Sequence, residues 1–284
     1  MDTTKVPIGV QSEPHAKYVD PDNVIAYALA SNDENPLYLS GQAVPPLFAV
    51  AVAWTAFMGM EALPPEATEG SHGGVHGEHD LYIQKPIVPG SWLHTVGERS
   101  AVVCSSAGMN VFAKLVTTDE DGDVVLEQYW SSLIRGPASG GDRGTPPADH
   151  SFPEAARDRP VGAISLPTTI DQTFRYAGAS ADRAPMHVDD EVARSFGFPR
   201  KFNQGLCTLA VTSRGLIELA AGGDPRRIRR IAVRFSSPVF PGNAVDLSVF
   251  DAGACPNGHH AFAFEASSEG AVALRHGLVE VAPA

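Results

Sequence analysis

The chain has 284 residues, a hydrophobic fraction of 43%, and 33 acidic against 21 basic side chains, for a formal net charge of -12. This length allows two domains with buried cores. The negative charge argues against nucleic acid as a partner, because phosphate binding needs clustered positive charge. The three cysteines lie far apart without a CxxC pair, which argues against a disulfide framework and a zinc knuckle.

The first half contains two helical stretches and several strands. A short helix precedes the turn in YALASNDENPLY, which begins at Tyr27, and the apolar run around LFAVAVAWTAFMGM predicts a longer helix over 45–60. That run is too short to span a membrane, and the N-terminus lacks the apolar segment of a secretory signal. We therefore expect a cytoplasmic protein without a membrane partner. β-type runs follow, with a turn at DEDGD, 119–123.

A linker and a repeat divide the chain. Residues 137–160 are rich in Pro, Gly, Ala and charged residues and show no apolar period. Across this segment, YALASNDENP matches YAGASADRAP at a separation of 149 residues, and LYIQKPIVPG matches VRFSSPVFPG at 152. We expect two copies of one fold, at 1–136 and 161–284, joined by the linker 137–160.

The second half repeats the order of elements. A short helix ends near Ser180, an Asp-x-x-Pro turn follows, and apolar residues from Leu206 to Ala220 fall on one face of a helix over 205–221. Three β-type runs complete the half, with a turn at SSEG, 267–270. One long helix and an antiparallel sheet, present twice, indicate an α+β fold in which each sheet wraps around its helix.

The motif at 176–187 resembles that of the MaoC-like hydratases and dehydratases. In the (R)-specific enoyl-CoA hydratases of this family, an aromatic residue precedes Ser-Gly-Asp-x-Asn-Pro, which is followed by an apolar residue and His. Here Tyr176 precedes SADRAPMH. A helix is expected to continue from there to about Gly197. Downstream, GLCT at 205–208 resembles the family's helix start. The first half resembles the N-terminal copy of two-domain members. The resemblance implies a double hotdog fold. The chain departs from the motif at Ala181, Ala184 and Gln204, where the family has Gly, Asn and often His.

Asp182 and His187 are the expected acid–base pair. Pro185 restricts the backbone between them, so that both side chains can face one water molecule from one side. The backbone N–H groups at the start of the helix at Gly205 can stabilise a thioester oxygen as it gains negative charge. The resemblance assigns this oxyanion contact to Gly205. On their own, Asp182 could instead cap a helix and His187 could be an ordinary first-turn residue.

The predicted activity is addition of water to 2-enoyl thioesters, or its removal from 3-hydroxyacyl thioesters, with an (R)-3-hydroxyacyl product. The substrate is an acyl-CoA or a carrier-protein acyl thioester; no cofactor is expected, and the resemblance implies a homodimer. The alternatives are a hotdog thioesterase and a non-catalytic acyl-thioester-binding or partner subunit. Substrate contacts are expected from six further residues: Tyr176, Ser180, Ala184, Arg200, Lys201 and Gln204.

Two other clusters have competing interpretations. His72, His76 and His79 could be metal ligands, but their spacing fits no zinc pattern, and we expect no metal. The basic run between Arg226 and Arg230 could meet a phosphorylated ligand or form a solvated face.

The first half is expected to be catalytically silent. It keeps an acid, Asp33, but Tyr38 stands where the second half has His187, and an unperturbed tyrosine titrates near 10. Asp33 would then serve as a turn and helix-cap residue. The helix over Leu47–Phe57 is expected to shape the space for the acyl chain.

Overall fold

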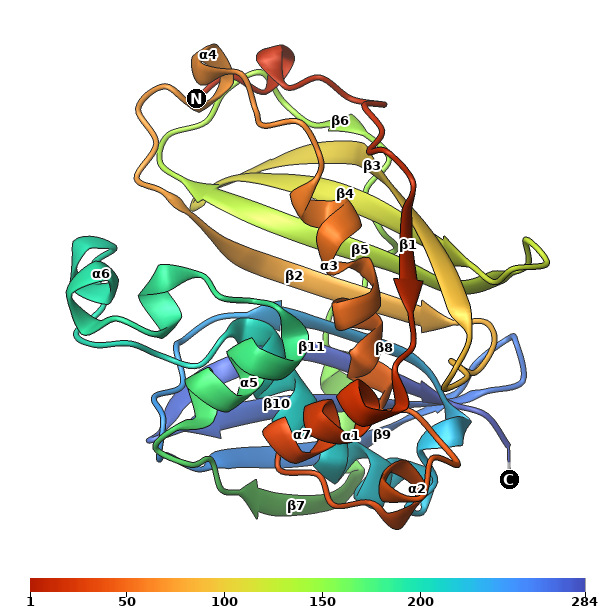
Figure 1. The fold of residues 1–284 in the computed structure, drawn as a ribbon. Helices are drawn as coiled ribbons and strands as arrows, with labels where there is room; N and C mark the ends of the chain where they lie inside the picture. The colour runs from red at the N-terminus through yellow and green to blue at the C-terminus, as the bar shows by residue number, and fades with distance from the viewer. Residues whose placement is uncertain (284) are drawn as a thin grey trace.

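One antiparallel sheet of eleven strands runs through the computed structural model, which describes residues 1–283 (Figure 1). The strands follow the order β1-β3-β4-β5-β2-β8-β11-β10-β9-β7, and β6 pairs with β3. Their bounds are β1 His15–Tyr18, β2 Gly74–Ile83, β3 Trp92–Ser105, β4 Gly108–Thr118, β5 Val124–Arg135, β6 Arg143–Gly144, β7 Pro160–Leu166, β8 Ile228–Phe235, β9 Val245–Ala254, β10 His260–Ser268 and β11 Ala271–Val281.

The two longer core helices, α3 and α7, lie on the inner side of this curved sheet, whereas η3 packs on its outer side. The α-helices are α1 Pro21–Ala30, α2 Pro36–Leu39, α3 Ala49–Met58, α4 Pro65–Thr68, α5 Gln172–Ser180, α6 Asp190–Ser195 and α7 Gly205–Ala221. The 3-10 helices are η1 Thr3–Lys5, η2 Pro46–Phe48, η3 Glu154–Asp158, η4 Pro185–His187 and η5 Pro225–Arg227. α3 packs against β1, β3 and β4, whereas α7 packs against β7, β8, β9 and β11. The α+β class expected from the sequence is confirmed.

The two halves have the same topology. From the outer edge inward, the first half reads β1-β3-β4-β5-β2 and the second reads β7-β9-β10-β11-β8. In chain order, a short helix, a turn and a longer helix lie between β1 and β2 in the first half and between β7 and β8 in the second. The sequence repeat therefore corresponds to a structural repeat.

Two expected helices differ from their sequence-based bounds. The predicted helix 205–221 is confirmed as α7, but α3 covers only Ala49–Met58 of the predicted 45–60. Pro45 and Pro46 precede it, and η2 forms there instead of an α-helical turn. The helix expected to continue to Gly197 is interrupted after η4. Asp189 then caps a separate helix, α6, by accepting the N–H groups of Glu191 and Val192.

β2 and β8 join the two halves. They pair antiparallel, with Asp80 opposite Ala232. Across this junction the Arg230 guanidinium holds the buried carboxylate of Asp80 at 2.9 and 2.8 Å. Arg234 binds Glu78 at 2.7 Å. Arg230 of the basic run therefore forms an ion pair within the fold. This favours a structural role for Arg230 over binding of a phosphorylated ligand.

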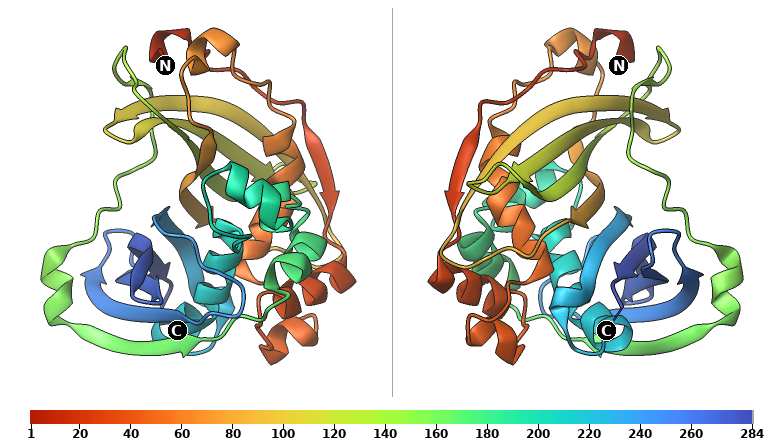
Figure 2. Two further views of the ribbon diagram at one scale, coloured as in Figure 1. Left: turned by 90° about the vertical axis from the view of Figure 1, so that its left-hand side faces the viewer. Right: turned by 90° about the vertical axis from the view of Figure 1, so that its right-hand side faces the viewer.

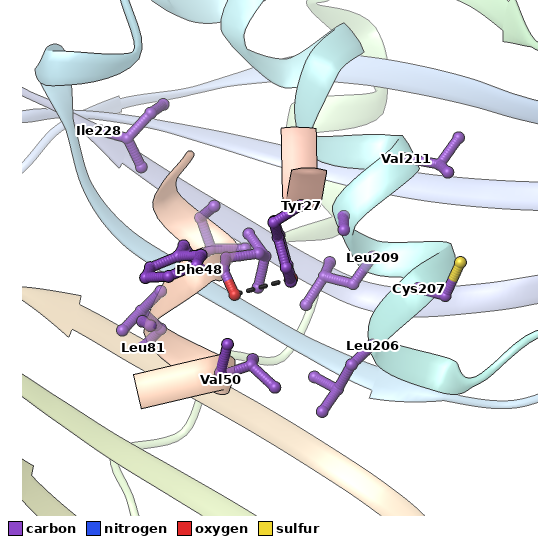
Figure 3. Close-up of a cluster of buried hydrophobic side chains, with 14 of the residues drawn as sticks. Tyr27, Phe48, Val50, Leu81, Leu206, Cys207, Leu209, Val211 and Ile228 are labelled. Atoms are coloured by element: carbon purple, nitrogen blue, oxygen red, sulfur yellow. Dashed lines mark hydrogen bonds between the residues drawn. The ribbon is translucent and has the colours of Figure 1, made fainter. Parts of the chain in front are cut away.

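A single hydrophobic core continues across the junction. Figure 3 shows Tyr27 and Phe48 of the first half beside Leu206 and Leu209 of α7. Tyr27 donates its hydroxyl hydrogen to the Leu47 carbonyl at 2.8 Å. Because both halves contribute to this core, separating them would expose apolar surface on each.

The segment 137–160 passes down one side of the molecule from β5 to β7 (Figure 2). It contains β6, η3 and the start of β7. Its His150 is buried and lies 3.1 Å from Glu78 of β2. Within residues 1–283, no helix has the length and apolar character that a membrane crossing requires.

Candidate active site

The turn after α5 holds the carboxylate of Asp182. α5 ends at Ser180, and Ala181 turns the chain in the left-handed conformation, with φ of 70°. The Ser180 hydroxyl donates to the Tyr176 carbonyl at 2.8 Å and accepts the N–H of Asp182 at 3.2 Å. The Asp182 carboxylate accepts the N–H of Ala184 at 3.2 Å. Ser180 and Ala184 therefore position Asp182, although we expected them to contact the substrate.

η4 then places His187 with a defined tautomer. Nδ1 of His187 lies 2.9 Å from the carbonyl oxygen of Phe202. A carbonyl only accepts hydrogen bonds, so Nδ1 carries the hydrogen and Nε2 keeps its lone pair. The ring of Phe202 also packs edge-on against the imidazole, with the two centroids 4.7 Å apart. His187 is thus oriented as a base.

One segment before α7 supports both groups. Phe202 accepts from His187, and two residues later the amide nitrogen of Gln204 donates to the carbonyl oxygens of Asp182 and Thr173, both at 3.2 Å. Gln204 is fully buried. Its contact is therefore with the backbone that carries the carboxylate, and it ties the turn at Asp182 to α5 and to the segment before α7.

Burial shifts the two titratable groups in opposite directions. It raises the pKa of Asp182 above its usual value, against the opposing effects of His187 and of the Ala184 N–H. It lowers the pKa of His187, against the opposing effects of Asp182 and of the Phe202 carbonyl. A neutral imidazole at neutral pH can accept a proton from water.

α7 begins at the same site with Gly205. No side chain caps its N-terminus, where backbone N–H groups lack partners within the helix. A Cβ on Gly205 would lie 3.1 Å from the ring of Phe235, so the site leaves little room for any other residue. These features suit the N-terminus of α7 to binding an oxygen that carries partial negative charge.

A cavity of about 270 Å³ opens beside His187 and Gly205. The second half contributes residues from η4, the segment before α7, α7 itself, β8 and β11, and the first half contributes β2 and β5. Its lining includes Val75, His76, Leu133, Arg135, Met186, Phe198, Phe202, Asn203, Thr208 and Phe235. The site is therefore shared between the halves.

The first-half wall of the cavity comes from the sheet. Strands β2 and β5 form it, through residues such as His76 and Leu133, and no residue of α3 reaches the lining. α3 lies one layer further back: Phe57 packs on Trp130 with the centroids 4.6 Å apart, and Trp130 stacks on His76 at 5.9 Å. α3 thus supports this cavity only from behind, and the expectation that the Leu47–Phe57 helix shapes the acyl space stays a prediction.

The other expected substrate contacts lie outside the cavity lining. Tyr176 is fully buried, and its hydroxyl donates to that of Tyr27 at 3.1 Å. Arg200 stacks on Phe240 at 4.8 Å. Lys201 binds Asp190 at 3.3 Å. Tyr176 thus ties α5 to α1, and the two cations are held by neighbours in the second half.

His76, Arg135 and Asn203 line the cavity but were not predicted as site residues. Asn203 was recognisable in principle, since it stands two residues before Gly205. His76 and Arg135 come from the other half of the chain, and their sequence positions give no indication of this proximity.

The histidines of the first half do not gather into a metal site. His76 and His79 lie with their ring centroids 5.6 Å apart, and Nε2 of His76 donates to the Glu78 carbonyl at 3.0 Å. Burial lowers the pKa of His76 to about 4. Among residues 1–283, no three His, Cys, Asp or Glu side chains converge for a metal ion.

The turn at Asp33 repeats the geometry of the turn at Asp182. Asn32 adopts a φ of 57°, and the Asp33 carboxylate accepts the N–H of Asn35 at 3.0 Å. Tyr38 is fully buried at the position equivalent to His187. This turn lacks an imidazole.

Residues 152–260 match the family model of the MaoC like domain. The chain contains a MaoC-like domain. Asp182, His187 and Gly205 all lie within the matched range.

Two related proteins match over about three fifths of this chain. It is 33% identical over 181 residues to 3-hydroxyacyl-thioester dehydratase Y of Mycobacterium tuberculosis, covering 62% of this chain and 61% of that protein. It is 30% identical over 179 residues to a probable enoyl-CoA hydratase 2 of Dictyostelium discoideum, covering 62% and 60%. The chain thus spans less than two thirds of these relatives.

Solved structures establish the double hotdog fold over the whole chain. A MaoC-like dehydratase from Phytophthora capsici superposes with a TM-score of 0.83 at 23% identity, covering 99% of this chain and 98% of that one. A Mycobacterium tuberculosis protein described as a double hotdog superposes with a TM-score of 0.64 at 14% identity, covering 99% and 97%. The expected fold is confirmed.

Proposed function

We propose that the chain is a hydro-lyase that adds water to 2-enoyl thioesters, or removes it from 3-hydroxyacyl thioesters. The observation that carries the proposal is that His187 and Gly205, the first residue of α7, line one cavity, and that Asp182, which is not part of the lining, lies close enough to His187 for each group to affect the pKa of the other. The names of the two relatives support it, since they describe a 3-hydroxyacyl-thioester dehydratase and a probable enoyl-CoA hydratase.

The geometry suggests a reaction on one face of the substrate. A water molecule held by Asp182 and His187 loses a proton to Nε2 of His187 while its oxygen bonds to C3. The electrons of the double bond move onto the thioester oxygen, which the N–H of Gly205 stabilises. As these electrons return, C2 takes up a proton from the same pair, so water adds syn. Dehydration follows the reverse path.

The product is proposed to have the R configuration at C3, as the resemblance of the motif at 176–187 to the (R)-specific enoyl-CoA hydratases implies. Both acid–base groups come from one turn, and delivery from one side gives a single enantiomer. A predominantly S product in chiral analysis of the 3-hydroxyacyl thioester would contradict this assignment.

The cavity favours a short acyl group. Its volume of about 270 Å³ is slightly below the usual range for small-molecule sites. The thioester is carried by coenzyme A or by a carrier protein, and the protein is proposed to work as a cytoplasmic homodimer. Light scattering tests the homodimer, and rates on enoyl thioesters of increasing length test the size limit.

The decisive experiment follows the absorbance of crotonyl-CoA with the purified protein. Loss of the conjugated thioester with no thiol release supports the hydro-lyase. Release of free thiol would indicate a thioesterase instead. Binding without either change would show a non-catalytic acyl-binding protein.

A further inference from the structure

Asn203 stands at the wall of the proposed active site. Its backbone N–H donates to the Val239 carbonyl at 2.8 Å, which fixes the chain just before α7. The residue is 2% exposed, yet it lines the cavity together with His187 and Gly205. Its side chain is thus a buried polar group next to the reacting centre.

The amide of Asn203 has no hydrogen-bond partner in the part of the chain that the structure describes. Neither Oδ1 nor Nδ2 finds one among residues 1–283. A buried amide that lacks partners destabilises the folded state, and most such groups in proteins are paired. The neighbouring Gln204 also has a buried Oε1 without a partner, but its amide nitrogen bridges two carbonyls and it lies outside the cavity lining. A ligand that pairs with Asn203 would explain why this side chain is tolerated.

The chemistry of the amide limits what that ligand atom can be. Nδ2 donates and Oδ1 accepts, whereas a thioester carbonyl can only accept and would leave Oδ1 unpaired. A hydroxyl group or a water molecule can both donate and accept. Turning the amide toward the cavity breaks no hydrogen bond to the protein, since it makes none.

The catalytic turn itself leaves a place for such a contact. Its residue at 184 is alanine, whose methyl side chain cannot form hydrogen bonds, and of the turn residues 180–187 the cavity is lined by Met186 and His187. A further hydrogen bond to the reacting oxygen has to come from another segment, and Asn203 is placed to supply it.

We propose that Asn203 binds the oxygen that the reaction transfers: the attacking water during hydration, and the 3-hydroxyl group during dehydration. This inference rests on the proposed hydro-lyase function. It makes Asn203 a substrate-binding residue that distinguishes 3-hydroxyacyl thioesters from acyl thioesters without the hydroxyl.

Asn203→Leu tests the proposal, because leucine is branched like asparagine but cannot form hydrogen bonds. We expect kcat for crotonyl-CoA hydration to fall about tenfold, roughly the effect of one hydrogen bond, while KM for crotonyl-CoA stays within about twofold. For dehydration, KM for 3-hydroxybutyryl-CoA should rise by about the same factor. The unfolding temperature should stay the same or rise, since an unpaired buried amide has been removed.

The matched control is Asn243→Leu. The Asn243 amide nitrogen is also buried without a partner among residues 1–283, but this residue does not line the cavity. The control should keep both kcat and KM. Unchanged kinetics in Asn203→Leu would overturn the proposal, as would a lower unfolding temperature with a matching loss of activity. An equal rise of KM for both substrates would assign the amide to the thioester carbonyl and also overturn it.

Binding measurements separate this inference from the proposed function. Wild type should bind 3-hydroxybutyryl-CoA more tightly than butyryl-CoA, and Asn203→Leu should lose that preference. Wild type that shows the preference without any turnover would refute the hydro-lyase and leave hydroxyl recognition standing. Turnover in wild type with no preference in binding would refute the inference alone.

Discussion

Asp182 and Asp33 occupy equivalent turns, so the same substitution at both positions separates chemistry from folding. Each carboxylate accepts a backbone N–H two residues later, at 3.2 Å for Asp182 and 3.0 Å for Asp33. Both residues are more than nine-tenths buried. The side-chain oxygen of asparagine can accept the same hydrogen bond, so Asp→Asn should preserve each turn.

The two substitutions should have the same effect on stability. Burial is the main cause that raises the pKa of Asp182 and of Asp33. The unfolded chain therefore loses these protons at a lower pH than the folded protein, and stability falls as pH rises through that window. A neutral amide removes this penalty. Both variants should unfold at pH 7 at the same temperature as wild type or above it.

Their activities should differ. A general acid–base group contributes about 10²–10⁴-fold, so Asp182→Asn should lose at least about a hundredfold in crotonyl-CoA hydration, whereas Asp33→Asn should stay within about tenfold of wild type. Hydration rates and thermal unfolding of both variants are measured side by side. Equal losses of activity in folded protein would show that both halves carry sites, and the assignment of a silent first half would be wrong.

Three further predictions concern stability. Ala181 has a φ of 70°, which is unfavourable by about 1–2 kcal/mol for an L-residue. Glycine relieves this strain, but its greater freedom in the unfolded chain costs about 0.5–1 kcal/mol. Ala181→Gly should therefore raise the free energy of unfolding, measured in urea, by about 0.5–1 kcal/mol. Asp80→Ala leaves the buried guanidinium of Arg230 with only Glu280, at 3.3 Å, as a carboxylate partner. It should therefore destabilise the protein by about 3 kcal/mol, the low end for a broken buried pair, with partial recovery in Asp80→Ala/Arg230→Met. No loss in the single variant would refute a role for this ion pair. His76 has a pKa of about 4 in the folded protein, whereas in the unfolded chain it takes up a proton below about pH 6.5. Between pH 6.5 and 5 the free energy of unfolding of wild type should therefore fall by about 2 kcal/mol more than that of His76→Gln. Parallel plots of the free energy of unfolding against pH for the two proteins would contradict this prediction.

The sequence was sufficient for the elements that depend on local pattern. The helix at 205–221 follows from apolar spacing, and the two strand turns follow from DEDGD and SSEG; α7 and the ends of β4 and β10 confirm them. The break between η4 and α6 was missed because Asp189 competes for backbone N–H groups that a continuous helix would use. That competition is local, and Val-Asp-Asp in the sequence could have indicated it.

The lining of the site was much less predictable. His76 and His187 are far apart in the chain and meet only because β2 and β8 share a ladder. Tyr176 looked like a substrate contact because it stands beside the motif, yet its partner is Tyr27 of the other repeat. Side chains near a catalytic motif in sequence can support the backbone, while the substrate walls come from elements that only the tertiary fold brings near.

The shared β2–β8 ladder has a consequence for how such a chain can change over generations. In an assembly of two identical single-hotdog chains, every substitution appears twice, and dilution can separate the partners. Here one chain encodes both copies, and the connection between them keeps their effective concentration high at any dilution. Each copy can therefore diverge alone. Tyr38 can replace an imidazole in one turn while His187 stays in the other, provided that β2 keeps the backbone edge that β8 requires.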